Sequence, residues 1–270
     1  MENSKSLKEK SLEIRKATLN LYRASAGFRL ASSLSVVEIL VALYYGDILK
    51  FNPKDPRDEN RDRFIISKGH GSISFYPILA DLGFFDKAEL DRMSQPGSFL
   101  ADIPDTRIPG YETINGALGH GLGVACGVAI ALKRKESDAK VFVLISDGEL
   151  YEGAVWEAIM FAGHHKLGNL NLIVDNNKRA MMGDCKEILD LEPVEEKFKV
   201  FNWRVKRVDG HDVEAVKIAL EEFKKEDQKP KVLIADTIKG KGVPQLELDP
   251  MSHIKNLKEE EVLSALQNLC

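Results

Sequence analysis

The sequence predicts an α/β fold in which a mostly parallel sheet carries helices on both faces. Short, largely apolar runs alternate along the chain with longer segments of helical periodicity. Strands that are apolar at successive positions are typical of a parallel sheet, because helices cover both of its faces. Each run also ends in glycine or polar residues, as a strand does where it enters a turn. The expected strands are 63–67, 141–145, 170–174, 203–208 and 231–236.

Helical periodicity places the expected helices between and before these strands. Apolar residues recur on one face of 7–26, which predicts a helical extension at the N-terminus. Glu38 follows Ser35 by three residues, the pattern of a capping box at the start of a helix. The remaining helices are expected at 35–45, 72–82, 116–133, 154–165 and 213–224. Because no linker divides the chain, residues 1–270 are expected to form one domain.

Composition limits the class of protein. The chain has 270 residues, of which 44% are hydrophobic and 30% charged, as is ordinary for a globular protein. A net charge of −4 gives no basic field for nucleic acid, and the apolar runs are far shorter than the roughly 20 residues that span a bilayer. The polar N-terminus and the separated cysteines Cys126, Cys185 and Cys270 favour a reducing compartment. We expect a cytoplasmic enzyme or enzyme subunit that binds neither nucleic acid nor membrane.

Side chains with oxygen atoms follow two of the expected strands. Asp147 comes after strand 141–145, and Asn177 comes after strand 170–174. In open parallel sheets, ligands bind beyond the carboxyl ends of the strands. A carboxylate, an amide oxygen and backbone carbonyls suit Mg²⁺ with phosphate oxygens, and Gly148 would let a phosphate approach the backbone. The residues therefore predict a metal–phosphate site, although an ordinary loop edge would have the same pattern.

The segments around these residues resemble the thiamine-diphosphate signature of the transketolase family. Asp147 and Asn177 are 30 positions apart (177 − 147), which is the spacing typical of that signature. The matching segments within it are DGE at 147–149, EG at 152–153, WEA at 156–158, LGNL at 167–170 and DNN at 175–177. Further segments match in the expected order: SKGHG at 67–71, NGALGHG at 115–121, VDGHD at 208–212 and TIKGKGV at 237–243. The resemblance covers nearly the whole chain and implies the thiamine-diphosphate-binding fold.

The resemblance implies thiamine diphosphate and Mg²⁺ as cofactors. Asp147, Asn177 and the backbone carbonyl of Arg179 would bind the metal ion. His70, His253 and Glu152 would act in catalysis, and Glu152 and Glu157 match acidic residues at the contact between subunits. Contacts with the cofactor are implied for His70, Gly116, Ala117, Leu118, Asp147, Gly148, Glu149 (mainly through its backbone amide), Asn177 and His253.

The resemblance also implies an incomplete active site. In transketolases, the glutamate that activates the aminopyrimidine ring belongs to a second, pyrimidine-binding domain, and the full-length enzymes are more than twice as long as this chain. The chain is therefore expected to be the N-terminal subunit of a split transketolase, which transfers a two-carbon ketol unit between sugar phosphates. A C-terminal subunit would complete a heterotetramer with two copies of each chain, with the small-residue helix 116–131 at the contact.

Two histidines of the family are replaced in this chain. Arg29 stands where a gap-free count places the first histidine, and Ile103 stands where the second is expected. A guanidinium remains protonated, so Arg29 cannot act as a base near neutral pH, but it can bind a carboxylate, sulfonate or phosphate through paired hydrogen bonds. We therefore expect Arg29 to be a catalytic residue that binds the substrate. Either the donor or acceptor is a modified or anionic sugar, or neighbouring residues substitute and ordinary sugar-phosphate transfer is retained.

Two further interpretations remain open. Residues 30–34 (LASSL) resemble the corresponding stretch of deoxyxylulose-phosphate synthases, which favours a related reaction with the same cofactor. A homologue that binds cofactor or a partner without catalysis is the other interpretation. The presence of Asp147, Asn177, His70, Glu152 and Glu157 argues against it, because a site that drifts loses its metal ligands early.

Overall fold

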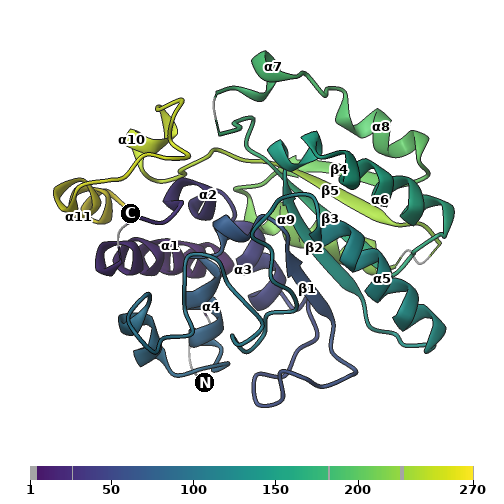
Figure 1. The fold of residues 1–270 in the computed structure, drawn as a ribbon, viewed down its shortest axis with the longest axis horizontal. Helices are drawn as coiled ribbons and strands as arrows, with labels where there is room; N and C mark the ends of the chain where they lie inside the picture. The colour runs from purple at the N-terminus through teal and green to yellow at the C-terminus, as the bar shows by residue number, and fades with distance from the viewer. Residues whose placement is uncertain (1–4, 26, 182, 226–227, 270) are drawn as a thin grey trace.

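The computed structural model of the chain describes residues 5–25, 27–181, 183–225 and 228–269. Within these residues, five strands form one sheet in the order β1-β2-β3-β5-β4, and every neighbouring pair is parallel (Figure 1). Ala26 and Cys270, which were part of the predictions above, lie outside the described residues. The strands are β1 (Arg63–Ile66), β2 (Val141–Ser146), β3 (Leu170–Asn176), β4 (Arg204–Asp209) and β5 (Lys231–Asp236). The predicted α/β class with a parallel sheet is confirmed.

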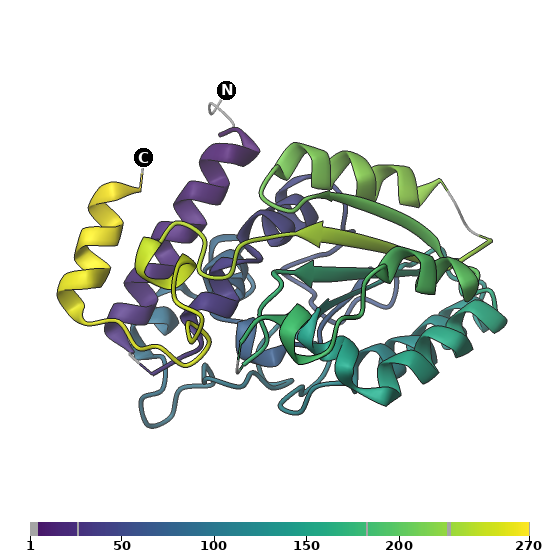
Figure 2. The ribbon, with the colours of Figure 1, turned by 90° about the horizontal axis from the view of Figure 1, so that it is seen from above.

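Helices cover both faces of this sheet. The α-helices are α1 (Leu7–Ala24), α2 (Leu30–Leu34), α3 (Val37–Tyr45), α4 (Phe75–Asp81), α5 (Gly121–Arg134), α6 (Gly153–His164), α7 (Cys185–Ile188), α8 (Val194–Val200), α9 (Val213–Lys224), α10 (Pro244–Glu247) and α11 (Glu259–Asn268). Three 3₁₀ helices are η1 (Gly69–Gly71), η2 (Lys87–Arg92) and η3 (Gly148–Tyr151). Figure 2 shows α9 on one side of the sheet and the pair α5 and α6 on the other. None of the helices in the described ranges is long and apolar enough to cross a membrane.

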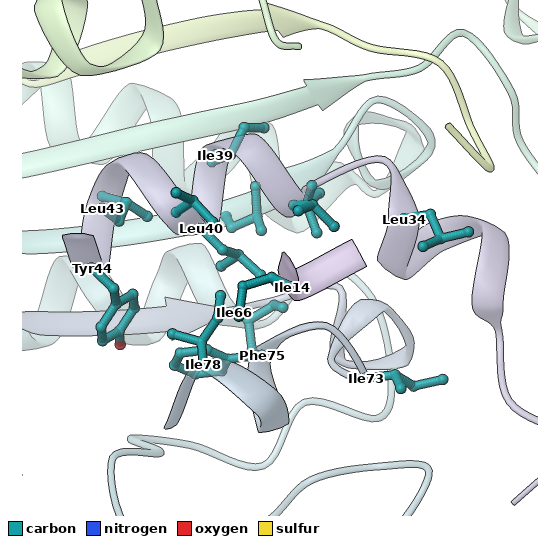
Figure 3. Packing of buried hydrophobic residues seen from close by; sticks show 14 of the residues in the cluster. Ile14, Leu34, Ile39, Leu40, Leu43, Tyr44, Ile66, Ile73, Phe75 and Ile78 are labelled. Atoms are coloured by element: carbon teal, nitrogen blue, oxygen red, sulfur yellow. The ribbon is translucent and has the colours of Figure 1, made fainter. Parts of the chain in front are cut away.

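Two separate hydrophobic clusters hold the helices to the sheet. Phe142 and Leu144 of β2 belong to the cluster under α1, α3, α4 and α9, whereas Val143 and Ile145 belong to the cluster under α5 and α6. This alternation follows from the pleat of a strand, which directs successive side chains to opposite faces. In the first cluster, Phe75 of α4 lies against strand β1 and helix α3 (Figure 3).

The predicted capping box at Ser35 is wrong. Helix α3 begins at Val37, after the separate short helix α2, and its N-cap residue makes no side-chain hydrogen bond. The Ser35 hydroxyl instead donates to Asp175 Oδ2 at 2.8 Å, and Glu38 pairs with Arg15 and His211. A hydrogen bond to a buried, ionised carboxylate is stronger than one from a backbone N–H at a helix N-terminus. The Ser35 hydroxyl therefore donates to Asp175 and does not cap the helix. The chain does form a capping box at α1, between Ser6 and Glu9.

The small-residue helix predicted to begin at residue 116 begins at Gly121, so its start is corrected as well. Residues 116–120 form a loop, in which Gly119 has a φ of +90° that side-chain-bearing residues rarely adopt. Its N–H donates to Glu149 Oε1 at 2.9 Å, which holds the loop away from a helical path. The sequence 116–118 therefore lies as an open loop beside the carboxyl edge of the sheet.

Candidate active site

The carboxyl ends of β2 and β3 bring Asp147 and Asn177 to the same edge of the sheet. Ser146 pairs in register with Asp175, so both residues of interest lie just past the last paired positions. Asp147 accepts hydrogen bonds from the N–H groups of Gly148, at 2.7 Å, and of Lys178, the residue after Asn177. Both side chains are buried. The strand-end argument thus correctly predicted where these two residues lie, and their role as metal ligands remains a prediction.

Hydrogen bonds determine how the Asn177 amide is turned. Its Nδ2 donates to Asp175 Oδ2 at 3.0 Å, and its Oδ1 accepts from the N–H of Arg179 at 3.1 Å. The chain atoms that could coordinate a cation here are therefore carboxylate, amide and carbonyl oxygens. Nowhere in the described part of the chain do three His, Cys, Asp or Glu side chains form a possible metal cluster. A hard ion such as Mg²⁺, which takes few protein ligands together with phosphate oxygens, fits this set.

Two buried lysines lie beside these oxygen atoms, and neither was assigned a role from the sequence. Lys68 Nζ pairs with Asp175 and donates to the carbonyl of Ser32 at 2.9 Å. Lys239 Nζ donates to the carbonyl of Arg179 at 2.9 Å. Both lysines line a cavity of about 270 Å³, together with Gly148. A lysine among glycines directly after a strand, as in SKGHG and TIKGKG, was the available sequence signal.

Like charges oppose one another at this edge of the sheet. Burial, and then the negative charge of Asp175, raises the pKa of Asp147 to about 7. Burial, and then the positive charge of Lys68, lowers the pKa of Lys239 to about 8. A divalent cation beside Asp147 and a polyanion beside the lysines would each favour the charged form of these groups. The residues present therefore fit a metal ion with a diphosphate.

His70 and His253 also line this cavity, and their rings are neighbours. The ring centroids lie 5.1 Å apart, and Ser32 Oγ lies 3.4 Å from His253 Nδ1. Burial and then Lys68 hold the pKa of His70 well below its usual range, while burial and Lys239 lower the pKa of His253 to about 4. Both imidazoles are therefore neutral near pH 7, so each has one ring nitrogen that can accept a hydrogen bond.

The remaining predicted site residues divide into two groups. Leu118 and Glu152 line the cavity, and Gly116 and Ala117 are exposed on the loop beside it. Glu149 is fully buried beneath that loop, where its carboxylate accepts from Ser67 Oγ and from the Gly119 N–H. The Glu149 N–H donates to Ser146 Oγ at 3.2 Å. Glu149 thus supports the loop from below through its side chain, a role that the sequence did not suggest.

Arg29 and Ile103 lie near the cavity but not in its lining. Arg29 precedes helix α2 and is half-buried. Its charge opposes the rise in the pKa of Asp102 that desolvation causes, and it adds to the effects that lower the pKa of His253. A Cβ placed on Gly116 would lie 3.7 Å from Ile103 Cγ2. Arg29 is thus close enough to act electrostatically on a cavity histidine, and Ile103 makes the wall beside Gly116 apolar.

Glu157 lies apart from this cavity. It is exposed on α6 and lines a groove of about 440 Å³ between α5 and α6, together with Gly123, Gly127 and Phe161. Its position agrees with a place at a subunit contact rather than at the reacting atoms.

Known proteins resemble this chain in sequence and in structure. The profile described as "Transketolase, thiamine diphosphate binding domain" matches residues 17–270. The 6-deoxy-6-sulfo-D-fructose transketolase subunit of Clostridium sp. (strain MSTE9) is 37% identical over 257 residues, covering 95% of this chain and 93% of the relative. An apulose-4-phosphate transketolase subunit of Actinobacillus succinogenes is 40% identical over 265 residues, covering 97% and 95%. The transketolase structure from Campylobacter jejuni has a TM-score of 0.91 at 33% identity and covers 97% of this chain.

The chain belongs to the transketolase family and comprises its thiamine-diphosphate-binding domain. It spans 42% of the Campylobacter jejuni transketolase, but 93% and 95% of the two relatives above that are named as subunits. This pattern of coverage is that of the N-terminal subunit of a two-chain transketolase, as the resemblance implied.

Proposed function

We propose that this chain binds thiamine diphosphate and Mg²⁺ and, with a C-terminal partner, transfers a two-carbon ketol unit from a ketose phosphate to an aldose phosphate. The observation that carries the proposal is the cavity at the carboxyl edge. Asn177, Lys68 and Lys239 line it, and Asp147 is buried directly beside it, next to the cavity residue Gly148. All of residues 1–270 would form a single cofactor-binding domain with α1 as its N-terminal extension. We place the complex in the cytoplasm.

Each group in the cavity has a part in holding the cofactor. Asp147 Oδ, Asn177 Oδ1 and the Arg179 carbonyl would bind Mg²⁺, while Lys68 and Lys239 would neutralise the diphosphate. Lys239 donates to the Arg179 carbonyl in the structure. A carbonyl oxygen has two lone pairs, so it could bind the metal ion through the other one. Gly116 to Leu118, Gly148 and the backbone of Glu149 would border the cofactor.

The chemistry divides between cofactor and protein. Thiamine diphosphate supplies the carbon nucleophile and stabilises the negative charge that develops on the substrate. His70 and His253 are neutral and can exchange protons with the hydroxyl and carbonyl groups of the sugar. Glu152, at the entrance to α6 and in the cavity lining, would transmit the state of one site to the partner subunit.

The α5–α6 groove is the proposed contact with the partner. Val124, Met160 and Phe161 are exposed large apolar residues on these two helices, and Glu157 lies in the groove between them. Apolar surface gathered around a groove is typical of a protein interface. Two copies of each chain would then form a heterotetramer, in which the partner supplies the glutamate that activates the aminopyrimidine ring.

Reconstitution with the partner tests this function. We expect no ketol transfer by the chain alone and transfer from xylulose 5-phosphate when the partner is added. Asp147→Ala should abolish Mg²⁺-dependent binding of thiamine diphosphate, measured by calorimetry on the complex. Asp236→Ala, at the end of the neighbouring strand β5, is the matched control and should leave that binding intact. Unaltered affinity in Asp147→Ala would contradict the ligand assignment.

A second candidate keeps the cofactor and changes the sugar. The positive charge of Arg29 near His253 favours a donor or acceptor with an anionic group, or one with fewer hydroxyl groups beside Ile103. The related subunit from Clostridium sp. is named for a sulfonated sugar, which agrees with this candidate. Arg29→His should shift the preference of the complex toward ordinary ketose phosphates, measured as the ratio of kcat/KM values. An unchanged ratio would favour ordinary sugar phosphates.

Two outcomes separate the remaining interpretations. Cofactor binding without activity on xylulose 5-phosphate, but with condensation of a 2-oxo acid, would favour a reaction like that of deoxyxylulose-phosphate synthases. Failure of the complex to bind thiamine diphosphate with Mg²⁺ would favour a non-catalytic homologue.

A further inference from the structure

Asp175 is a fully buried carboxylate that takes no direct part in the proposed site. It is the sixth residue of β3 and has no exposed surface. Its Oδ2 accepts from Lys68 Nζ, from Ser35 Oγ and from Asn177 Nδ2, and its Oδ1 accepts from Thr237 Oγ1. These donors come from the segment after β1, the end of α2, the end of β3 and the segment after β5. One carboxylate therefore joins four of the segments that border the cavity.

We infer that Asp175 is a positioning residue for the metal site, because its carboxylate determines which end of the Asn177 side chain is free to bind a cation. The inference rests on the metal ligands proposed above. Asp175 does not itself touch the metal ion in this account, and it acts through Asn177.

The orientation of the Asn177 amide follows from what each atom can donate or accept. An ionised carboxylate only accepts hydrogen bonds, so the end of the Asn177 amide that faces Asp175 must be the NH₂ group. The other end must be the oxygen, because it accepts from the Arg179 N–H. A half-turn of the amide would break both contacts and present an NH₂ group, which cannot coordinate Mg²⁺.

The same carboxylate also compensates the charge of Lys68. The Lys68 side chain is 1% exposed, and its ammonium group contacts Asp175 and the Ser32 carbonyl. Removal of the Asp175 charge would disturb this lysine as well as the amide. A test of the inference therefore has to separate the orientation of Asn177 from a general loss of the buried network.

Asp175→Asn is the first variant. An amide at position 175 can accept or donate, so it no longer dictates which end of Asn177 faces it. We expect the Mg²⁺ concentration for half-maximal binding of thiamine diphosphate to rise at least about tenfold, as is typical when the hydrogen-bond partner of a metal ligand is removed. Calorimetric titration of the complex between the full chain and its partner measures this binding without relying on turnover.

Asp236→Asn is the matched control. Asp236 Oδ1 accepts from Asn176 Nδ2 at 2.7 Å, the same type of contact one residue earlier in the chain, and it does not line the cavity. We expect its Mg²⁺ dependence to stay within about twofold of the unmodified chain, since no proposed ligand depends on it.

A double variant with Asp175→Asn and Asn177→Asp separates an effect on the orientation of residue 177 from a general loss of the buried network. A carboxylate at 177 presents an oxygen to the metal in either orientation, and an amide at 175 can donate to it. The doubly substituted chain should bind Mg²⁺ at least about fivefold more tightly than Asp175→Asn alone, a coupling that a double-mutant cycle detects. Simply additive losses would overturn the inference, because a purely structural role for Asp175 gives no recovery.

The remaining outcomes also decide the question. A folded Asp175→Asn variant with unchanged Mg²⁺ dependence would overturn the inference. If that variant does not fold, Thr237→Val removes one donor from Asp175 and keeps its charge. Because the contact of Asp175 Oδ2 with Asn177 remains, we then expect the Mg²⁺ affinity to stay within about twofold of the unmodified chain. A loss of about tenfold or more would overturn the inference, because the buried network as a whole and not the orientation of Asn177 would then govern the site. Asn177→Ala separates the two proposals: unchanged Mg²⁺ dependence there refutes the metal site itself, whereas loss there with normal Asp175→Asn refutes only the positioning role.

Discussion

The two faces of the sheet differ in how completely helices of this chain cover them. On one face, α3 lies against the sheet and is itself covered by α1, α4 and α9, so that eight of its residues, Val37–Tyr44, are buried. On the other face, α5 and α6 form a single layer (Figure 2). These two helices carry the exposed residues Val124, Met160 and Phe161. On the first face, α3 is enclosed within this chain, whereas the second face exposes apolar side chains of the kind found at protein interfaces.

The composition of the helices explains this difference. Helix α3 reads VEILVALYY, which is apolar on nearly all sides and is therefore stable only when it is surrounded. Helix α5 reads GLGVACGVAIALKR, in which glycine and alanine alternate with larger residues. Gly123 and Gly127 are exposed, and a Cβ added to either would meet no atom within 4 Å. The outer side of α5 therefore has room for another chain to approach closely.

The largest expected effect is a loss of stability on the face covered by α1, α3, α4 and α9. Phe75 is fully buried, and its ring centroid lies 5.1 Å from that of Tyr44, 5.4 Å from that of Phe64 and 5.1 Å from that of Tyr111. Phe75→Ala should lower the free energy of unfolding by about 3–5 kcal/mol, because it leaves a cavity among aromatic rings. Urea denaturation of the chain measures this loss. Phe161→Ala, on the exposed face, should change stability by less than about 0.5 kcal/mol, and equal losses would contradict the comparison.

A substitution on the face covered by α5 and α6 should change partner binding and leave the stability of the chain unchanged. Gly127→Arg places a long charged side chain in the α5–α6 groove, where a Cβ meets no atom of this chain. We expect the affinity for the C-terminal partner to fall by at least a factor of ten, about 1.4 kcal/mol, while the melting temperature of the chain alone is unchanged. Sedimentation of the mixed chains measures the association, and Gly127→Ala is the control. Full association of Gly127→Arg would place the partner elsewhere.

A smaller loss of stability is expected at the N-terminus of α9, which lies on the same face of the sheet as α3. Asp212 accepts hydrogen bonds from the N–H groups of Glu214, at 3.1 Å, and Ala215, at 3.0 Å. Asp212→Ala removes this cap and should cost about 1 kcal/mol of stability. Asp212→Asn keeps the acceptor oxygen and should cost much less, and chemical denaturation of the two variants distinguishes them. Equal losses would mean that the charge, not the cap, stabilises the helix.

The smallest effect is a pH dependence on the same face. Burial alone would raise the pKa of Asp81, but hydrogen bonds from Lys87, Lys10 and Tyr45 lower it to about 2. The folded-state pKa is thus below the unfolded value near 3.8, so the stabilisation is complete above that value and is lost as pH falls toward 2. Because Asp81 is partly exposed, the contribution is modest. The stability difference between the unmodified chain and Asp81→Asn should shrink from pH 5 to pH 2, and a constant difference would contradict this assignment.

Residues that follow a strand directly in the sequence were the predictable part of the site. Asp147 and Asn177 come one and two residues after paired positions of β2 and β3, so the strand pattern alone placed them at one edge. The aligned motifs of the family then suggested the cofactor. Lys239 was overlooked even though it is in a quoted motif, because a lysine in a sequence gives no sign of being buried.

The sequence by itself determined the strands, most of the helices and the family, because apolar periodicity and short motifs are local properties of the chain. Only the tertiary structure decided which residues, far apart in the sequence, form hydrogen bonds to the same carboxylate. Lys68 and Asp175 are 107 positions apart and meet because β1 and β3 flank β2 in the sheet. The same buried charge draws the Ser35 hydroxyl away from the helix that its sequence predicted it would cap. Burial makes such long-range ionic contacts strong enough to override local preference, and burial is a property of the folded chain.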